Sequence, residues 1–582
     1  MGGPKAEAWG IAPGYHDISG QWRRPQPATE AALLTAMGAS AEEPETRAGA
    51  LVVRSGDQRK VPEPELVTED GARLRLQGHL PAELPLGYHL LRGERHERRL
   101  VVNPGECCLP DGLHGFGFVV QLYALLSAAS AGIGDLADLG ALGRWAREDL
   151  RAAFLLVNPL HAPLPGLPQE PSPYYPSSRR FLNPLYLRLE DVPGTSREAL
   201  NAEPSLDRDR VYEVKIGLLE AAWLRARGRA AASLRRFRAE RPGLQEYAVF
   251  CALTEVHGRA WREWPAELRH PASAAVARFA REQADRVGFH EWLQLQLDLQ
   301  LREAAGRPPM IVNDLAIGAH PDGADAWAWQ GQLAAGVSVG APPDPFNAEG
   351  QDWGLPPFDP WRLRAAGYEP FVQTLRAAFR HAAGVRVDHV MGLFRLYWIP
   401  AGQGPEAGAY VRYPAAELLD ILALESLRAG AYVVGEDLGT VEDQVREELR
   451  RRQVLSYKLL WFEPGDPAHY PAQALAALTT HDLPTVRGVW SGADPMPEVR
   501  ERLQRLPGAD DDVLLAAYRA LAAAPCRLLA ATLEDVTGMS ERPNRPGTID
   551  EHPNWSLRLP LTLEQLMGDE RPRSVARILS RS

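Results

Sequence analysis

The spacing of apolar residues changes near residue 105 of this 582-residue chain, and the change predicts two kinds of structure. In residues 1–105, short segments alternate between apolar and polar positions, and glycine, proline and charged residues separate them. This pattern is typical of a small antiparallel β domain. A helical segment over about 29–37 precedes the expected strands at 51–53, 64–67, 73–76, 88–91 and 99–102. We therefore expect residues 1–105 to form an N-terminal extension with a small β-sandwich-like domain.

From residue 106 onward, near-continuous apolar runs alternate with amphipathic stretches. Such runs suit parallel strands buried on both faces, and the stretches between them suit crossover helices. The expected strands are 116–122, 153–157, 310–312, 384–387, 432–434 and 476–479. A doubly wound sheet normally has a glycine-rich phosphate turn after its first strand, and we find none there. The pattern therefore favours an α/β fold in which residues 106–582 form a (β/α)₈ TIM barrel.

Two stretches interrupt the expected barrel. Residues 207–307 are rich in Ala, Leu, Glu and Arg at helical spacing, as in 211–227 and 292–305, and are too long for one crossover. We expect a helical insertion there. Residues 340–357 lack regular periodicity and contain five prolines, which predicts a long, functional loop. Because only 27 residues (582 − 555) follow Trp555, we expect no C-terminal β domain.

Charge and composition narrow the function classes. The chain has 75 acidic and 64 basic residues and a net charge of −11, which makes nucleic acid an unlikely main partner. No apolar stretch approaches the roughly 18 residues of a membrane span, and no apolar run follows the first residues. Four cysteines without zinc-finger spacing indicate reduced thiols rather than a disulfide framework. We therefore expect a cytoplasmic protein that binds neither membrane nor nucleic acid.

Acidic residues follow four of the expected barrel strands. Parallel strands of a barrel all end at the same rim, where barrel enzymes place their chemistry. One such aspartate often only caps the next helix, but four acids, two of them beside a histidine, are difficult to explain as caps. The four acids are Asp314, Asp388, Glu436 and Asp482, and the two histidines are His389 and His481.

Clustered carboxylates indicate either a metal site or glycosyl chemistry. The pairs Asp388–His389 and His481–Asp482 are potential metal ligands, although neither shows helical His-x-x-x-His spacing. Arg386 lies two residues before Asp388, on the same face of an expected strand, and a guanidinium there keeps a carboxylate ionised. This arrangement favours a nucleophile over a metal ligand, and we expect no metal site.

The ordered set of motifs resembles the catalytic signature of the α-amylase clan, and most closely its amylomaltase (4-α-glucanotransferase, disproportionating enzyme) branch. The clan signature corresponds to residues 386–389, 435–436 and 481–482. The resemblance covers about residues 116–565. The segments typical of the branch are 340–347, 350–356, 435–441, 172–175 with 183–184, and 544–547 with 554–555.

The resemblance implies a retaining double displacement without a cofactor. It assigns Asp388 as the nucleophile, Glu436 as the general acid/base and Asp482 as the stabiliser of the transition state. Retaining glycosyl transfer needs one ionised and one protonated carboxyl group, and an apolar strand behind Glu436 is expected to raise its pKa. Asp314 resembles the family residue that supports the arginine, here Arg386.

The same resemblance implies a set of substrate contacts. Tyr174 resembles a tyrosine that contacts glucan, and the loop at 340–357 is expected to overhang the site. In that loop, Trp353 is expected to stack on a glucose ring and Gln351 to bind its hydroxyl groups. His389 and His481 are expected to donate hydrogen bonds to sugar hydroxyls.

The implied activity is the transfer of α-1,4-glucan segments from one maltodextrin to the 4-hydroxyl of another. Three alternatives remain open at this point. A hydrolase of the same clan differs only in whether water or a sugar opens the intermediate. A sugar phosphorylase needs a phosphate pocket, and no basic cluster lies beside the motifs. A catalytically silent glucan-binding protein would be expected to lack a catalytic carboxylate, and all three are present.

Overall fold

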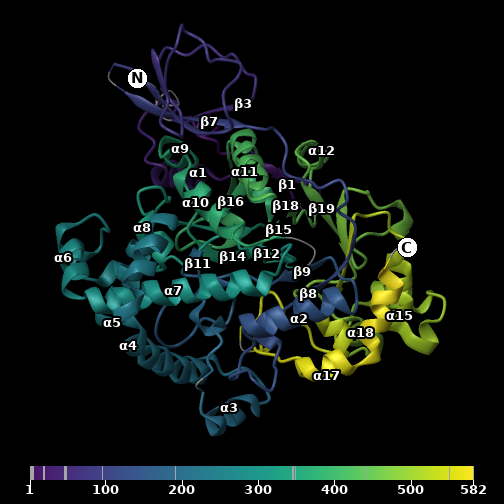
Figure 1. Ribbon diagram of the computed structural model, residues 1–582. Coiled ribbons are helices and arrows are strands. Elements are labelled where there is room, and N and C mark those ends of the chain that lie inside the picture. The colour runs from purple at the N-terminus through teal and green to yellow at the C-terminus, as the bar shows by residue number, and fades with distance from the viewer. Residues whose placement is uncertain are drawn as a thin grey trace.

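The computed structural model describes residues 5–17, 20–44, 49–94, 96–190, 192–343, 347, 349–439, 441–549 and 551–580. Residues 344–346 and 440, which belong to the motif segments 340–347 and 435–441, lie outside the described residues. Figure 1 shows an N-terminal sheet at the top, a group of helices at the lower left and the C-terminal helices at the lower right.

Eight parallel strands form a closed barrel at the centre of the chain. Each strand pairs with the next barrel strand in the sequence, and β21 pairs with β8 to close the sheet. The predicted (β/α)₈ barrel is therefore confirmed. Two of its strands, β19 and β21, are absent from the sequence prediction. The barrel strands are β8 (Gly115–Val120), β9 (Phe154–Val157), β12 (Ile311–Leu315), β15 (Gly384–Val387), β18 (Tyr432–Gly435), β19 (Leu455–Leu459), β20 (Ala474–Ala477) and β21 (Leu528–Thr532).

Apolar side chains fill the barrel and join it to its helices. Inward-facing residues such as Val312, Val434 and Leu475 form one buried cluster in the barrel, which accounts for the near-continuous apolar runs of the strands. Apart from α1, which precedes the N-terminal sheet, and the helices within 207–307, the α-helices of the described residues are α2 (Leu136–Glu148), α3 (Gly194–Asn201), α8 (Ala324–Ala328), α9 (Pro360–Ala365), α10 (Glu369–Ala378), α11 (Ala415–Ala429), α12 (Asp443–Arg451), α13 (Val486–Ser491), α14 (Pro497–Gln504), α15 (Ala509–Ala522), α16 (Leu533–Thr537), α17 (Leu563–Gly568) and α18 (Glu570–Leu579).

The N-terminal region contains a five-stranded sheet in the order β3-β7-β6-β4-β5. Its strands lie where the alternating pattern predicts them, but the expectation of a purely antiparallel sheet is wrong. β3 pairs with β7 in parallel, because the chain after β3 crosses to the other side of β6 before it forms β4. The strands are β3 (Leu51–Arg54), β4 (Glu65–Val67), β5 (Arg73–Arg75), β6 (Gly87–Arg92) and β7 (Glu97–Asn103).

A second, antiparallel sheet lies between barrel strands, in the order β14-β13-β16-β17. The prediction of an irregular loop at 340–357 is partly wrong, because this segment contains β14 and the end of β13. Glycine and proline hide the alternation that would otherwise identify such short strands. The predicted N-terminal helix, α1 (Pro27–Ala36), packs against this sheet. The strands are β13 (Val337–Ala341), β14 (Gln351–Leu355), β16 (Arg395–Pro400) and β17 (Ala409–Arg412), and the hairpin strands β1 (Tyr15–His16) and β2 (Trp22–Arg23) precede α1.

Four α-helices occupy the segment where the insertion is expected, between α3 and β12. The short strands β10 (His161–Ala162) and β11 (Ser178–Leu182) pair with each other before α3. The four helices are α4 (Arg208–Glu240), α5 (Leu244–His257), α6 (Ala274–Glu282) and α7 (Ala284–Ala305). The carboxylate of Asp207 caps α4 by accepting from the backbone N–H of Arg210. The helical stretches predicted at 211–227 and 292–305 lie inside α4 and α7. Among the described residues, no helix is both long and apolar enough to cross a bilayer.

Candidate active site

Strand register places Asp314 directly opposite Arg386 at the carboxyl end of the barrel. The two residues are Cα partners in the parallel ladder of β12 and β15. Arg386 Nη1 donates to Oδ1 and Oδ2 of Asp314, at 2.6 and 2.8 Å, and to Oδ1 of Asp388 at 3.0 Å. One buried guanidinium nitrogen therefore joins two carboxylates that come from neighbouring strands.

Burial and charge act in opposite directions on Asp388. Burial, with the nearby negative charges of Asp314 and Glu436, raises the pKa of Asp388 to about 6, while Arg386 acts to lower it. Arg386 acts on Asp388 in the direction that the sequence predicts, but the burial effect is larger. A carboxyl group with a pKa of about 6 is mostly ionised at pH 7.

Glu436 follows β18 and accepts one backbone hydrogen bond at each oxygen. The N–H of His389 donates to Oε2 at 2.9 Å, and the N–H of Leu438 donates to Oε1 at 2.8 Å. His389 adopts a left-handed φ of 45°, an uncommon conformation for a non-glycine residue. Burial raises the pKa of Glu436 although Arg386 and these two donors oppose the shift. Each oxygen retains a second lone pair, so a protonated Glu436 is compatible with both bonds.

Asp482 follows β20 and is the most open of the three carboxylates, with its side chain 42% exposed. Its Oδ1 accepts from Asn544 Nδ2 at 2.7 Å, and its Oδ2 lies 3.3 Å from His481 Nε2. Burial acts to raise the pKa of Asp482, but the charge and hydrogen bond of His481 and the donor Asn544 outweigh it, and the pKa is lowered. Asp482 is therefore ionised when Glu436 is protonated.

Aromatic rings line the same end of the barrel. Tyr174 stacks on His481 with ring centroids 4.9 Å apart, and its hydroxyl donates to Asp314 Oδ2 at 2.6 Å. The Trp555 ring contacts both, at centroid distances of 5.4 Å to Tyr174 and 5.2 Å to His481. Tyr174 thereby connects the carboxylate pair around Arg386 to the His481–Asp482 pair.

The hairpin of β13 and β14 brings Trp353 beside His389. Their rings meet edge to face with centroids 5.4 Å apart, and Trp353 Nε1 donates to Gln351 Oε1 at 2.9 Å. Burial lowers the pKa of His389, so this ring is neutral at pH 7. The indole of Trp353 is half-buried and its remaining surface is open to solvent.

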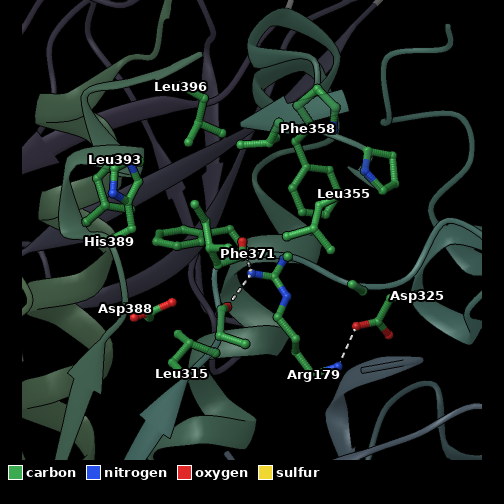
Figure 2. Close-up of a pocket in the computed structure, with 18 of the residues that line it drawn as sticks. Arg179, Leu315, Asp325, Leu355, Phe358, Phe371, Asp388, His389, Leu393 and Leu396 are labelled. Carbon is green, nitrogen blue, oxygen red and sulfur yellow. Dashed lines mark hydrogen bonds between the residues drawn. The ribbon is translucent and has the colours of Figure 1, made fainter. Parts of the chain in front are cut away.

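An apolar cavity of about 100 Å³ adjoins Asp388 and His389. Figure 2 shows these two residues at one side of the cavity and Asp325 at the other. Arg179 donates to the backbone carbonyls of Ala316 and Ile317, at 3.2 and 2.8 Å, between the two sides. Most of the remaining wall is aliphatic or aromatic, including Leu315, Phe358, Leu393 and Leu396. This apolar wall accounts for the burial that raises the pKa of Asp388.

The structure adds contacts that the sequence prediction of site residues omits. Asn544 and Trp555 both touch predicted site residues, and Arg542 Nη1 donates to the backbone carbonyl of Asp482 at 2.7 Å. Arg542 is itself held by Asp494 through two hydrogen bonds of 2.7 Å. Asn544 and Trp555 belong to the late motif segments 544–547 and 554–555, so the signal to find them was present.

The described residues include no group of three or more His, Cys, Asp or Glu side chains placed to hold one metal ion. The carboxylates contact arginine, histidine, asparagine and backbone N–H groups instead. Carboxylates arranged in this way at the rim of a (β/α)₈ barrel define an enzyme of the class that acts on glycosidic bonds.

Comparison with known proteins identifies the family. The profile of the family described as 4-alpha-glucanotransferase matches residues 120–562. The chain is 43% identical to the 4-alpha-glucanotransferase of Mycobacterium bovis, covering 85% of this chain and 80% of that protein. It is 31% identical to the 4-alpha-glucanotransferase of Haemophilus influenzae, covering 84% of this chain and 82% of that protein.

A solved structure agrees with this assignment over the whole chain. The amylomaltase of Corynebacterium glutamicum aligns with a TM-score of 0.86 and 30% identity, covering 99% of both chains. The chain belongs to the 4-alpha-glucanotransferase family. Its activity is that of a 4-alpha-glucanotransferase acting on alpha-glucans, and the family resemblance found in the sequence is confirmed.

Proposed function

We propose that this enzyme transfers α-1,4-glucan segments between maltodextrins by a retaining double displacement with Asp388 as the nucleophile. In the first step, Asp388 attacks the anomeric carbon, and Glu436 donates its proton to the departing sugar oxygen. Arg386 supports this assignment, because its positive charge opposes the effect of the apolar cavity and Asp388 remains mostly ionised at neutral pH. The raised pKa of Glu436 supports its role as the acid.

In the second step, Glu436 is ionised and takes the proton from the 4-hydroxyl of an incoming glucan. The new glycosidic bond forms as the ester bond to Asp388 breaks, and Glu436 is left protonated for the next cycle. Asp482, which carries a negative charge close to His481, stabilises the positive charge that develops on the glucosyl ring. Asp314 acts through Arg386 rather than on the substrate, and no cofactor enters the scheme.

We assign the glucan contacts to the side chains around the carboxylates. Tyr174 and His481 form one stacked wall, and Trp353 stands beside His389 on the other. Trp353 offers a flat surface on which a glucose ring stacks. Gln351 accepts from the indole N–H through its side-chain oxygen and offers its amide N–H groups to a sugar hydroxyl. His389 and His481 donate to hydroxyl groups of the ring that is transferred.

One observation carries the proposal: Asp388 and Glu436 end neighbouring barrel strands, and Arg386 contacts Asp388 directly. The test is product analysis with maltotriose as the sole substrate. We expect glucose together with a ladder of longer maltodextrins, and we expect Asp388→Asn to abolish both. Asp443→Asn, an exposed carboxylate in the first turn of α12, is the matched control and keeps wild-type products. Production of shorter sugars only would indicate a hydrolase, and more than a few per cent of the rate in Asp388→Asn would refute the nucleophile.

A further inference from the structure

A groove of about 530 Å³ separates the C-terminal half of α4 from α7, away from the carboxylates described above. Figure 1 shows the two helices side by side at the lower left. Along α4, Arg229, Ser233 and Arg236 repeat at intervals of four and three residues, so they share one face of the helix. On α7, Arg302 lies on the face that carries Trp292 and Leu299. Three arginines from two helices therefore line one concave surface.

The charge of this groove is not balanced by the protein. Its two carboxylates, Asp298 and Glu240, are both engaged by Arg380, which donates to Asp298 and lies 3.7 Å from Glu240. Among the described residues, Arg229, Arg236 and Arg302 form no ion pair with any carboxylate.

Neighbouring arginines of α4 differ in this respect. Arg227 donates to Asp285 of α7 at 3.0 Å, and Arg238 is paired with Glu291 of α7. Asp285 and Glu291 of α7 therefore neutralise Arg227 and Arg238, whereas Arg229 and Arg236, which lie between these two in the sequence and line the groove, have no such partner among the described residues. In a chain with a net charge of −11, this local excess of positive charge identifies the preferred ligand as an anion.

The floor of the groove is apolar. Trp292, Phe237 and Leu295 are buried at 8%, 4% and 9% exposure and form the surface between the arginines. Glucans are uncharged, so a bound glucan would leave the positive charge of the three arginines without a counter-charge. Three guanidinium groups offer more donors than the two oxygens of a carboxylate can use, whereas a phosphate presents three oxygens that accept forked hydrogen bonds.

We propose that the groove between α4 and α7 binds a phosphate ester of a sugar or nucleoside. Its phosphate contacts Arg229, Arg236 and Arg302, and its ring packs on the apolar floor at Trp292. This site is separate from the one that carries out glucan transfer. Its occupancy is measured without turnover, so the outcome does not depend on the roles of Asp388 and Glu436.

The test is isothermal titration calorimetry of the full-length protein with three probes: glucose 6-phosphate, ADP and inorganic phosphate. We expect saturable binding of at least one ester with a Kd below about 1 mM, and weaker binding as sodium chloride is increased. Tighter binding of glucose 6-phosphate would identify the ligand as a sugar phosphate, and tighter binding of ADP would identify it as a nucleoside phosphate. Equal affinity for inorganic phosphate would overturn the ring contact with Trp292.

Variants locate the binding. Arg229→Ala combined with Arg236→Ala is expected to weaken the bound ester at least tenfold, and Arg302→Ala, on the opposite wall, to weaken it in the same direction. Alanine is the best helix former, so both helices are retained. The matched control combines Arg235→Ala with Arg500→Ala, two exposed arginines outside the groove, and keeps the wild-type affinity. No saturable binding to the wild type, or unchanged affinity in the groove variants, would overturn the site.

Discussion

Removing the charge of Asp314 is expected to move the pH dependence of catalysis to lower pH. As the proposed nucleophile, Asp388 is expected to act only when ionised, and burial together with neighbouring carboxylates raises its pKa to about 6. Activity should therefore fall as the pH drops through about 6. Asp314→Asn keeps the shape of the side chain and a carbonyl acceptor for Arg386, but removes one negative charge that disfavours ionisation of Asp388.

The contacts of Arg386 set the size of the effect. Oxygens of Asp314 and Asp388 lie 2.6 and 3.0 Å from the same Nη1 atom, so their separation is at most the sum of these distances, about 5.6 Å. At an effective dielectric constant of about 20, two charges at that distance repel by about 3 kcal/mol, which corresponds to about 2 pH units. Solvent screening and rearrangement of Arg386 reduce this figure, and we expect the acid limb to move down by about 1 to 2 pH units.

The assay is the pH dependence of kcat/KM for glucose release from maltotriose, which reports groups of the free enzyme. Tyr174→Phe is the control, because it removes the 2.6 Å hydrogen bond to Asp314 without changing any charge near Asp388. This variant should keep the acid limb near pH 6 even if its rate falls. An acid limb in Asp314→Asn that stays in place or moves to higher pH would refute the electrostatic account of Asp388.

Three further outcomes follow from the same geometry. Trp353→Ala should lower transfer more than hydrolysis and raise the ratio of reducing sugar to transfer product about tenfold, because a sugar acceptor competes with water at ~55 M only if it is positioned by binding and stacking. Equal loss of both rates would make Trp353 a general binding residue. Glu436→Gln should lose nearly all activity with maltotriose but should still form the enzyme-bound glycosyl ester readily from a glycosyl fluoride, because fluoride leaves without a proton. Equal loss of ester formation from both donors would exclude Glu436 as the acid. Exhaustive chelation should leave the transfer rate unchanged, and activity lost to chelation and restored by zinc or calcium would show a metal-dependent reaction.

Hydrophobic periodicity predicts most of the barrel and fails where polar residues lie in strands. β19 contains Ser456, which donates to Asp437 at 2.6 Å, and Lys458, which pairs with Glu463 at 2.9 Å. These contacts satisfy polar groups that break the apolar run. The pattern misses β21 for a different reason: Leu528–Thr532 follows the Ala- and Leu-rich helix α15 and does not differ from it in composition. Tertiary pairing, rather than local pattern, decides both strands.

Site residues at strand ends can be predicted from the sequence more easily than site residues that long-range contacts bring in. Asp314, Asp388 and Glu436 are predictable because each lies at the carboxyl end of a strand, and a barrel brings all such ends together. Asn544 contacts Asp482 across 62 residues from a segment without regular structure, so only its motif segment, and no periodicity, indicates it. Neither kind of signal reveals the raised pKa of Asp388, since it depends on the apolar wall that separate loops and helices assemble beside it.

The central claim, a covalent glycosyl ester on Asp388, is tested most directly by mass spectrometry. Glu436→Gln incubated with α-maltosyl fluoride should form the ester, because fluoride leaves without a proton, and should break it down slowly, because no base activates the acceptor. After acid quenching and proteolysis, the account predicts that the peptide containing Asp388 gains the mass of one maltosyl group. The variant that also carries Asp388→Asn should show no adduct. An adduct on another residue, or none while the fluoride is consumed, would contradict the account.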